Sequence, residues 1–184
     1  MKTVNLVIGS SPEIDELAAF TREFKKESDR GAVLVAASRL DEVLMRLLSA
    51  YFRDSKAAQE LLDGYNPLST FAARASTAHA LSLIEDHEFR EITLIRKIRI
   101  EFAHKWRDIG FGSEKIMSYC SGLPWLGSRH VKATDRRGRV RFDCVVLVLL
   151  TDLLHREHLI LREKRVARLW TNTTRRPKAT ETST

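Results

Sequence analysis

The sequence predicts an all-α fold, a single-domain bundle of six or seven helices. Glycine (8) and proline (4) are scarce among its 184 residues, which argues against a turn-rich β fold. Apolar residues recur every three or four positions over long segments, and this spacing is the period of one helix face. Hydrophobic residues make up 43% of the chain, and a chain of this length can bury a sizeable single core.

Capping residues place the first two helices. Ser11 followed by Pro12 is typical of a helix start, because the serine side chain accepts an orphan N–H and proline has none to leave unpaired. Ser28 and Asp29 predict the start of a second helix. Its apolar stripe continues at helical spacing to Tyr51, so we expect this helix to be the best defined of the bundle.

Three further helices follow along the chain. Ser55 is expected to cap a short helix that ends at Gly64, since glycine readily adopts the left-handed conformation that closes many helices. Ser69 or Thr70 is expected to start the next helix, which is rich in alanine. Asp86 is expected to cap a long helix that ends near residue 106.

The last third of the chain has a less regular pattern. Residues 113–120 predict a short helix, and residues 131–142 alternate in a way that fits either a small β-hairpin or a helix start. A long helix is expected over residues 142–169, because the length of this segment favours helix over strand. The expected organisation is one helical domain over residues 1–170 and a disordered polar and basic tail over residues 171–184.

Positive charge is concentrated in the C-terminal half. The formal net charge is +7, while residues 129–141 hold six Lys/Arg against one acid and residues 156–178 hold eight against two. Such an excess favours binding to nucleic acid or another polyanion, and a solvated helix face is the alternative interpretation. The candidate nucleic-acid contacts, of the kind that bind phosphate, are Arg136, Arg137, Arg139 and Arg141.

Several classes of protein and site are not expected. The longest apolar run, residues 144–150, is far shorter than the ~20 residues that cross a bilayer. Cys120 and Cys144 form no disulfide framework or metal spacing, so we interpret them as reduced thiols of a cytoplasmic protein. His155 and His158 lack a third ligand at matching spacing, and we therefore expect neither a metal nor a cofactor.

Three segments carry a resemblance to a known family: EFKKESDRGAVLVAASRLDEVLMRLL, LLDGYNPLSTFAARASTAHALSLI and LIRKIRIEFAH. From about residue 17 to residue 106 the chain resembles the MtlR (mannitol operon repressor) family of bacterial regulators. The resemblance implies an all-helical, non-enzymatic repressor of a carbohydrate (mannitol-type) operon, without a recognisable helix-turn-helix. It implies action through a regulatory protein partner or through weak DNA contacts, and a homodimer is a further candidate assembly.

The residues agree with the lack of a helix-turn-helix. The best candidate joins the helix that follows Ser55 to the helix that follows Thr70, but the connection is longer than the usual turn of three or four residues. The second of these helices carries a single long donor, Arg74, which is a poor basis for reading base edges.

One segment allows a different function. LIRKIRIEFAH also resembles the Arg-x4-His signature of HEPN domains, many of which are ribonucleases, and the matching residues are Arg99 and His104. In such an enzyme the histidine would transfer protons and the arginine would hold the scissile phosphate. An ideal helix turns two such side chains about 140° apart, and the next residue, Ile100, cannot form hydrogen bonds where those nucleases commonly have a polar residue.

The favoured interpretation of Arg99 is structural, and it leaves the protein without catalytic residues. Asp41 borders the apolar stripe of the second helix and needs a partner, because an unpaired buried charge is costly. We therefore predict that Arg99 pairs with Asp41, Asp29 or Glu27, and that His104 is at least half-buried. A HEPN-like ribonuclease or RNA-binding protein, and a protein-interaction module without a nucleic-acid role, are the alternative functions.

Overall fold

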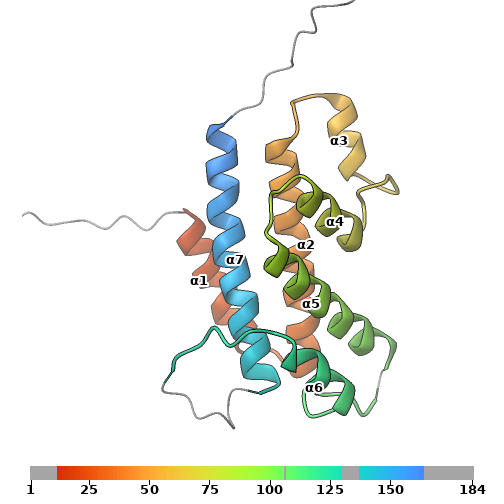
Figure 1. The fold of residues 1–184 in the computed structure, drawn as a ribbon, viewed down its shortest axis with the longest axis vertical. Coiled ribbons are helices and arrows are strands. Elements are labelled where there is room, and N and C mark those ends of the chain that lie inside the picture. The colour runs from red at the N-terminus through yellow and green to blue at the C-terminus, as the bar shows by residue number, and fades with distance from the viewer. Residues whose placement is uncertain (1–11, 106, 130–136, 164–184) are drawn as a thin grey trace, which may run out of the picture.

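A computed structural model describes residues 12–105, 107–129 and 137–163. Within these residues the chain forms seven helices and no strand, so the prediction of an all-α bundle is confirmed (Figure 1). The helices are α1 (Pro12–Phe24), α2 (Asp29–Tyr51), α3 (Lys56–Leu62), α4 (Phe71–Ala80), α5 (Asp86–His104), α6 (Glu114–Ser121) and α7 (Arg139–Arg162).

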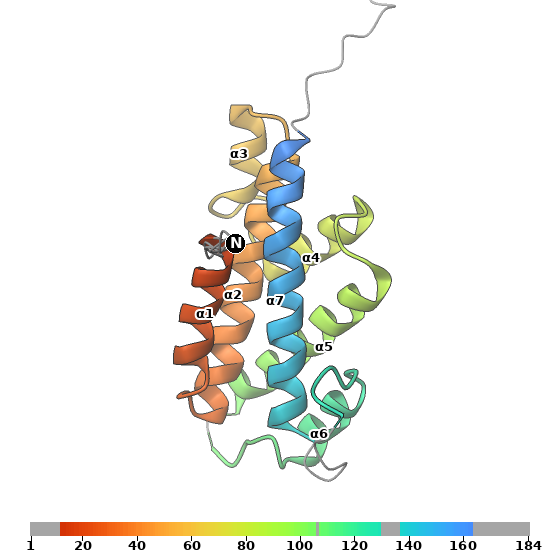
Figure 2. The ribbon, with the colours of Figure 1, turned by 90° about the vertical axis from the view of Figure 1, so that its left-hand side faces the viewer.

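The longest helices, α2 and α7, form the centre of the bundle. They pack side by side, with α1 against one side of the pair and α4 and α5 against the other (Figure 2). Apolar stripes drive this arrangement, since each helix must bury its apolar face against another. The fully buried large side chains come from five helices and the segment after α6: Phe24, Leu40, Leu44, Leu47, Leu48, Ile92, Ile95, Ile98, Phe102, Ile116, Leu123 and Phe142.

Local capping fixes most helix starts as the sequence predicts. The side chains of Ser28, Ser55 and Thr70 accept hydrogen bonds from backbone N–H groups in the first turns of α2, α3 and α4, at 3.1, 3.3 and 3.2 Å. The helix α1 begins at Pro12, and Gly64 adopts the expected left-handed conformation with φ 59°. These predictions hold because capping involves residues within one turn of each other.

The start of α5 differs in its capping residue. Glu85, not Asp86, is the N-cap, and the Glu88 carboxylate accepts the backbone N–H of Glu85 at 2.6 Å. The Glu85 side chain in turn accepts from the backbone of Glu88, which completes a capping box. Asp86 instead binds His79 of α4 through its carboxylate, at 2.8 Å.

Of the two alternatives predicted for residues 131–142, the helix start and not the β-hairpin is found where the structure describes this segment. Residues 139–142 form the first turn of α7, after Gly138 with φ 54°. Phe142 begins a buried stripe that continues through Val145 and Val146, and this helical spacing outweighs the short alternating pattern. Residues 131–136 lie outside the described residues, as do the expected end of the last helix and the predicted tail of residues 171–184.

None of the helices in the described part of the chain is long and apolar enough to cross a membrane.

Candidate functional site

The predicted ion pair of Arg99 is wrong. Arg99 is exposed on α5, and within the described residues no ion pair joins it to Asp41 or Asp29. Asp41 binds Arg74 of α4 instead, with 2.9 Å between Oδ1 and Nη1, and Arg74 Nε also donates to the carbonyl of Leu68. Asp41 does need a partner, but α4 and not α5 supplies it because α4 packs over this part of α2.

The partner of Asp29 comes from α7. Its carboxylate accepts a hydrogen bond from the backbone N–H of Phe111 at 3.2 Å, and Arg139 Nη1 donates to it at 3.3 Å. Arg139 Nε also lies 2.7 Å from Asp143, and the guanidinium lies 5.5 Å from the ring centre of Phe24. Arg139 was a predicted nucleic-acid contact, and the structure shows that its guanidinium instead joins α7 to the turn between α1 and α2.

The other predicted nucleic-acid arginines differ among themselves. Arg141 Nη1 donates to the carbonyls of Ser121 and Leu123, at 3.3 and 3.1 Å, so its guanidinium also lies against the protein. Arg137 is exposed, while Arg136 lies outside the described residues. Of the three predicted arginines that the structure describes, Arg139 and Arg141 therefore form contacts within the bundle, and Arg137 is exposed.

The outer face of α5, defined here as Arg90, Thr93, Lys97, Ile100 and His104, carries uncommitted positive charge. Arg90, Lys97 and His104 are exposed and lie seven residues apart, which places them along one line of the helix. The prediction that His104 is at least half-buried is wrong. Within the described part of the chain no hydrogen bond or ion pair joins His104 to Arg99. On an ideal helix these two side chains point about 140° apart.

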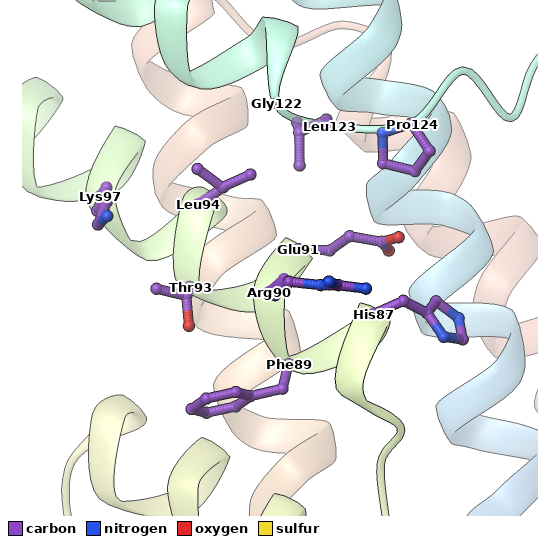
Figure 3. Close-up of a pocket in the computed structure, with 10 residues that line it drawn as sticks. All are labelled: His87, Phe89, Arg90, Glu91, Thr93, Leu94, Lys97, Gly122, Leu123 and Pro124. Carbon is purple, nitrogen blue, oxygen red and sulfur yellow. The ribbon is translucent and has the colours of Figure 1, made fainter.

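A pocket of about 660 Å³ lies beside the outer face of α5, between this helix and residues 122–124 after α6 (Figure 3). Its size is within the range of small-molecule sites, roughly 300–1,000 Å³. Apolar and charged side chains both line it. The apolar lining comes from Phe89, Leu94, Leu123 and Pro124, and the charged or titratable lining from His87, Arg90, Glu91 and Lys97.

Glu91 is the unusual member of this lining. The residue is only 7% exposed, yet no hydrogen bond or ion pair to its carboxylate exists in the described residues. Burial raises the pKa of Glu91, and the negative charges of Glu88 and Asp152 raise it further, while His87 acts in the opposite direction. No carboxyl oxygen of Glu91 is fully buried without a partner, so the group opens to the pocket (Figure 3).

The neighbouring carboxylate of Glu88 shows what a satisfied buried acid looks like here. Glu88 is 2% exposed, and its two oxygens accept hydrogen bonds from Arg156 of α7 at 2.7 and 3.0 Å. Those bonds hold the charged form and raise the pKa of Arg156 although burial acts against it. Glu91 lacks such a cation and lies one turn further along α5.

Neither thiol has surroundings that activate it. Burial raises the pKa of Cys120 to about 12, and burial together with the charge of Asp143 raises the pKa of Cys144. Because the thiolate is the reactive form, a raised pKa disfavours nucleophilic attack by either group.

Sequence analysis missed both buried glutamates, Glu88 and Glu91, and the pocket that Glu91 lines together with residues 122–124. A signal was present, since Glu88 and Glu91 lie seven and four residues before Ile95 and thus share the apolar stripe of α5. Two carboxylates on a buried stripe indicate a cation partner or a ligand. The pocket itself had no signal, because residues 122–124 approach α5 only through the packing of α6.

Comparison with solved structures identifies one likeness. It is to a chain in the X-ray structure of the MtlR–HPr complex from Escherichia coli, with a TM-score of 0.57 and 18% identity, over 77% of this chain and 97% of that one. The fold is MtlR-like. No protein-family model and no curated protein sequence matches the chain. The MtlR-like fold extends the resemblance of the three segments to nearly the whole bundle, and at this identity it concerns the fold alone.

Proposed function

We propose that this chain is an MtlR-like regulator that acts by binding another protein and has no enzymatic activity of its own. The observation that supports the proposal is the MtlR-like fold, because the E. coli chain that shares it was crystallised in a complex with HPr. An HPr-type protein is therefore the first partner to test. The raised pKa values of both thiols agree with the proposal, as does the lack of a nucleophile paired with a base among the described residues that line the pocket.

The outer face of α5 is the surface we assign to the partner. Arg90 and Lys97 are exposed, and no ion pair in the described residues neutralises either of them. Lys97 lies 6.0 Å from the ring centre of Tyr119, which limits its movement without removing its charge. A complementary partner would present acidic side chains, and such pairs govern association rate and specificity more than affinity.

The regulatory role would be repression of a carbohydrate (mannitol-type) operon in the cytoplasm. Two arginines at the start of α7, Arg139 and Arg141, are engaged within the bundle, which supports action through a protein over direct DNA contact. A homodimer and weak DNA contacts through residues such as Arg137 stay part of the hypothesis. Salt-dependent DNA binding by the purified protein would support the second of these.

Isothermal titration calorimetry with HPr from the same organism tests the partner. We expect saturable binding that weakens as salt is raised, and loss of that binding in the variant Arg90→Glu/Lys97→Glu. The matched control is Arg22→Glu/Lys25→Glu, which reverses one exposed charge in the last turn of α1 and one directly after this helix, and it should bind like the unmodified chain. A complete lack of binding at low salt would contradict the proposal for this partner.

A HEPN-like ribonuclease is the second candidate, because Arg99 and His104 are both exposed and Arg99 has no acidic partner among the described residues. Incubation of RNA with the protein in the presence of a chelator tests it. Under our proposal no cleavage occurs. Cleavage that disappears in both Arg99→Ala and His104→Ala, and persists in the control His155→Ala on α7, would replace the regulator by a nuclease.

A further inference from the structure

The pocket beside α5 is lined by one acid, Glu91, that no cation in the described residues binds. From this structure we infer that the pocket binds a small apolar molecule carrying an ammonium group, and that the Glu91 carboxylate holds this group. The pocket shares Arg90 and Lys97 with the outer face of α5, but the inference does not depend on the proposed protein partner, because Glu91 and not these cations selects the ammonium group. It assigns a ligand class to a site that neither the fold nor the resemblance identifies.

Glu91 is the acid that lines the pocket, and the charges of Glu88 and Asp152 also act on it. Of these three acids, only Glu88 is bound by a cation in the described residues, Arg156. Both terminal nitrogens of Arg156 donate to Glu88, so they leave Glu91 unsatisfied. A buried carboxylate without a partner is destabilising, and a bound ammonium group would remove that penalty by donating hydrogen bonds and a charge.

The lining of the pocket also carries positive charge. Arg90 and Lys97 line it from α5, and so does His87, whose Nδ1 lies 3.2 Å from the Glu85 carboxylate. In Figure 3 the Arg90 guanidinium and the Glu91 carboxylate extend side by side toward α7, although no ion pair joins them in the described residues. A ligand with an anionic group near its ammonium group would satisfy both, and an amino acid is the simplest such molecule.

The remaining lining specifies an apolar body for the ligand. Phe89 and Leu94 project from α5, and Leu123 and Pro124 approach from the connection after α6. Burying an apolar side chain against this wall is favourable by about 25 cal/mol for each Å² removed from water. The combination of an ammonium group, an anionic group and an apolar body describes apolar amino acids such as phenylalanine or leucine.

Ammonium binding should also change the protonation of Glu91. Burial and the nearby acids raise the pKa of the free carboxyl group, and the charges that face it are His87 and Arg90 on α5, Glu88 on α5 and Asp152 on α7. A bound ammonium group favours the ionised carboxylate and lowers that pKa. Any proton held by the free carboxyl group is therefore released to solvent when the ligand binds.

The test uses calorimetry of the full chain with three related probes. L-Phenylalanine has both charged groups, 2-phenylethylamine lacks the carboxylate and 3-phenylpropanoate lacks the ammonium group. We expect phenylalanine to bind best and phenylpropanoate to bind at least about tenfold more weakly, since one lost charged contact is worth roughly 1.4 kcal/mol or more. The variant Glu91→Gln should lose about tenfold for phenylalanine and should no longer discriminate it from phenylpropanoate.

The matched control is Asp152→Asn, which removes one nearby negative charge on α7 without altering the lining of the pocket. It should retain the discrimination between the three probes, and circular dichroism should show that both variants fold. Equal affinity of the unmodified chain and Glu91→Gln for phenylalanine would overturn the inference. Equal binding of phenylalanine and phenylpropanoate, or no saturable binding of any probe, would overturn it as well.

Discussion

The surroundings of Arg139 and the outer face of α5 treat positive charge in opposite ways. Arg139 binds the carboxylates of Asp29 and Asp143, donates to the carbonyls of Glu27 and Phe24, and packs against an aromatic ring. On α5, Arg90 and Lys97 are exposed, and no ion pair in the described residues joins either of them to an acid. The guanidinium of Arg139 is occupied by contacts that hold α1, α2 and α7 together. The charges of Arg90 and Lys97 remain available to another molecule.

The difference shows what decides the role of a basic side chain. Both regions belong to helices with a basic surface, and neither the residue type nor the local charge distinguishes them. Arg139 lies where the start of α7 meets the turn between α1 and α2, within reach of carboxylates and carbonyls. Among the residues that the structure describes, no hydrogen bond or ion pair joins Arg90 or Lys97 of the outer face of α5 to such a group, so these cations are available to a partner or a ligand.

The largest effect is expected from Arg156→Ala. Like Arg139, Arg156 is an arginine of α7 that is paired inside the bundle, here with Glu88 on the buried side of α5. This change leaves Glu88, a residue that is 2% exposed, as an unpaired buried charge. We expect a loss of about 3 kcal/mol in the free energy of unfolding, measured by urea denaturation. The control Arg162→Ala, at an exposed position on the same helix, should change little. Equal effects of the two variants would remove the distinction between committed and available charge.

A smaller loss is expected from Arg139→Ala. The side chains of Arg139 and Asp143 are 21% and 26% exposed, so solvent weakens their interaction and we expect about 2 kcal/mol. Burial raises the pKa of Asp143 although Arg139 acts against it, and the variant should raise that pKa further. The unfolding free energy again measures the effect, and an unchanged value would show that Arg139 is as free as the arginines of α5.

Glu91→Gln tests the same contrast on an acid that no cation binds. We expect this variant to be more stable than the unmodified chain at pH 7. Burial raises the pKa of Glu91 above its ordinary value of 4.5, so the folded state binds the proton more tightly than the unfolded state. The ionised Glu91 carboxylate therefore lowers the free energy of unfolding at neutral pH, and this loss vanishes as the pH falls below 4.5. Thermal unfolding from pH 7 to pH 4 measures it, and a difference that does not depend on pH would contradict this account.

The smallest effect is expected from Arg99→Ala. Arg99 is exposed and has no acidic partner in the described residues, so its removal should change the free energy of unfolding by less than about 0.5 kcal/mol. Urea denaturation alongside Arg139→Ala gives the direct contrast. A loss as large as that of Arg139→Ala would mean that Arg99 has a structural role after all.

The structure does not support the roles that the sequence predicted for Arg99 and Arg139. Arg99 followed an apolar position and was assigned to a structural ion pair, while Arg139 stood among other arginines and was assigned to nucleic acid. Both assignments used neighbours along the chain. Of the predicted acids, Asp41 did need a partner, but this partner is Arg74 on a different helix.

Capping residues and apolar spacing in the sequence determined the class of the fold and the starts of most helices. These signals are local, since a cap or a stripe involves residues within a few positions of each other. Only the tertiary structure decided which charges are paired, because the decisive contacts join residues 33 and 110 positions apart, as in Arg74–Asp41 and Arg139–Asp29. The tertiary structure also determined the pocket that Glu91 lines, because residues 122–124 reach α5 only through the packing of α6.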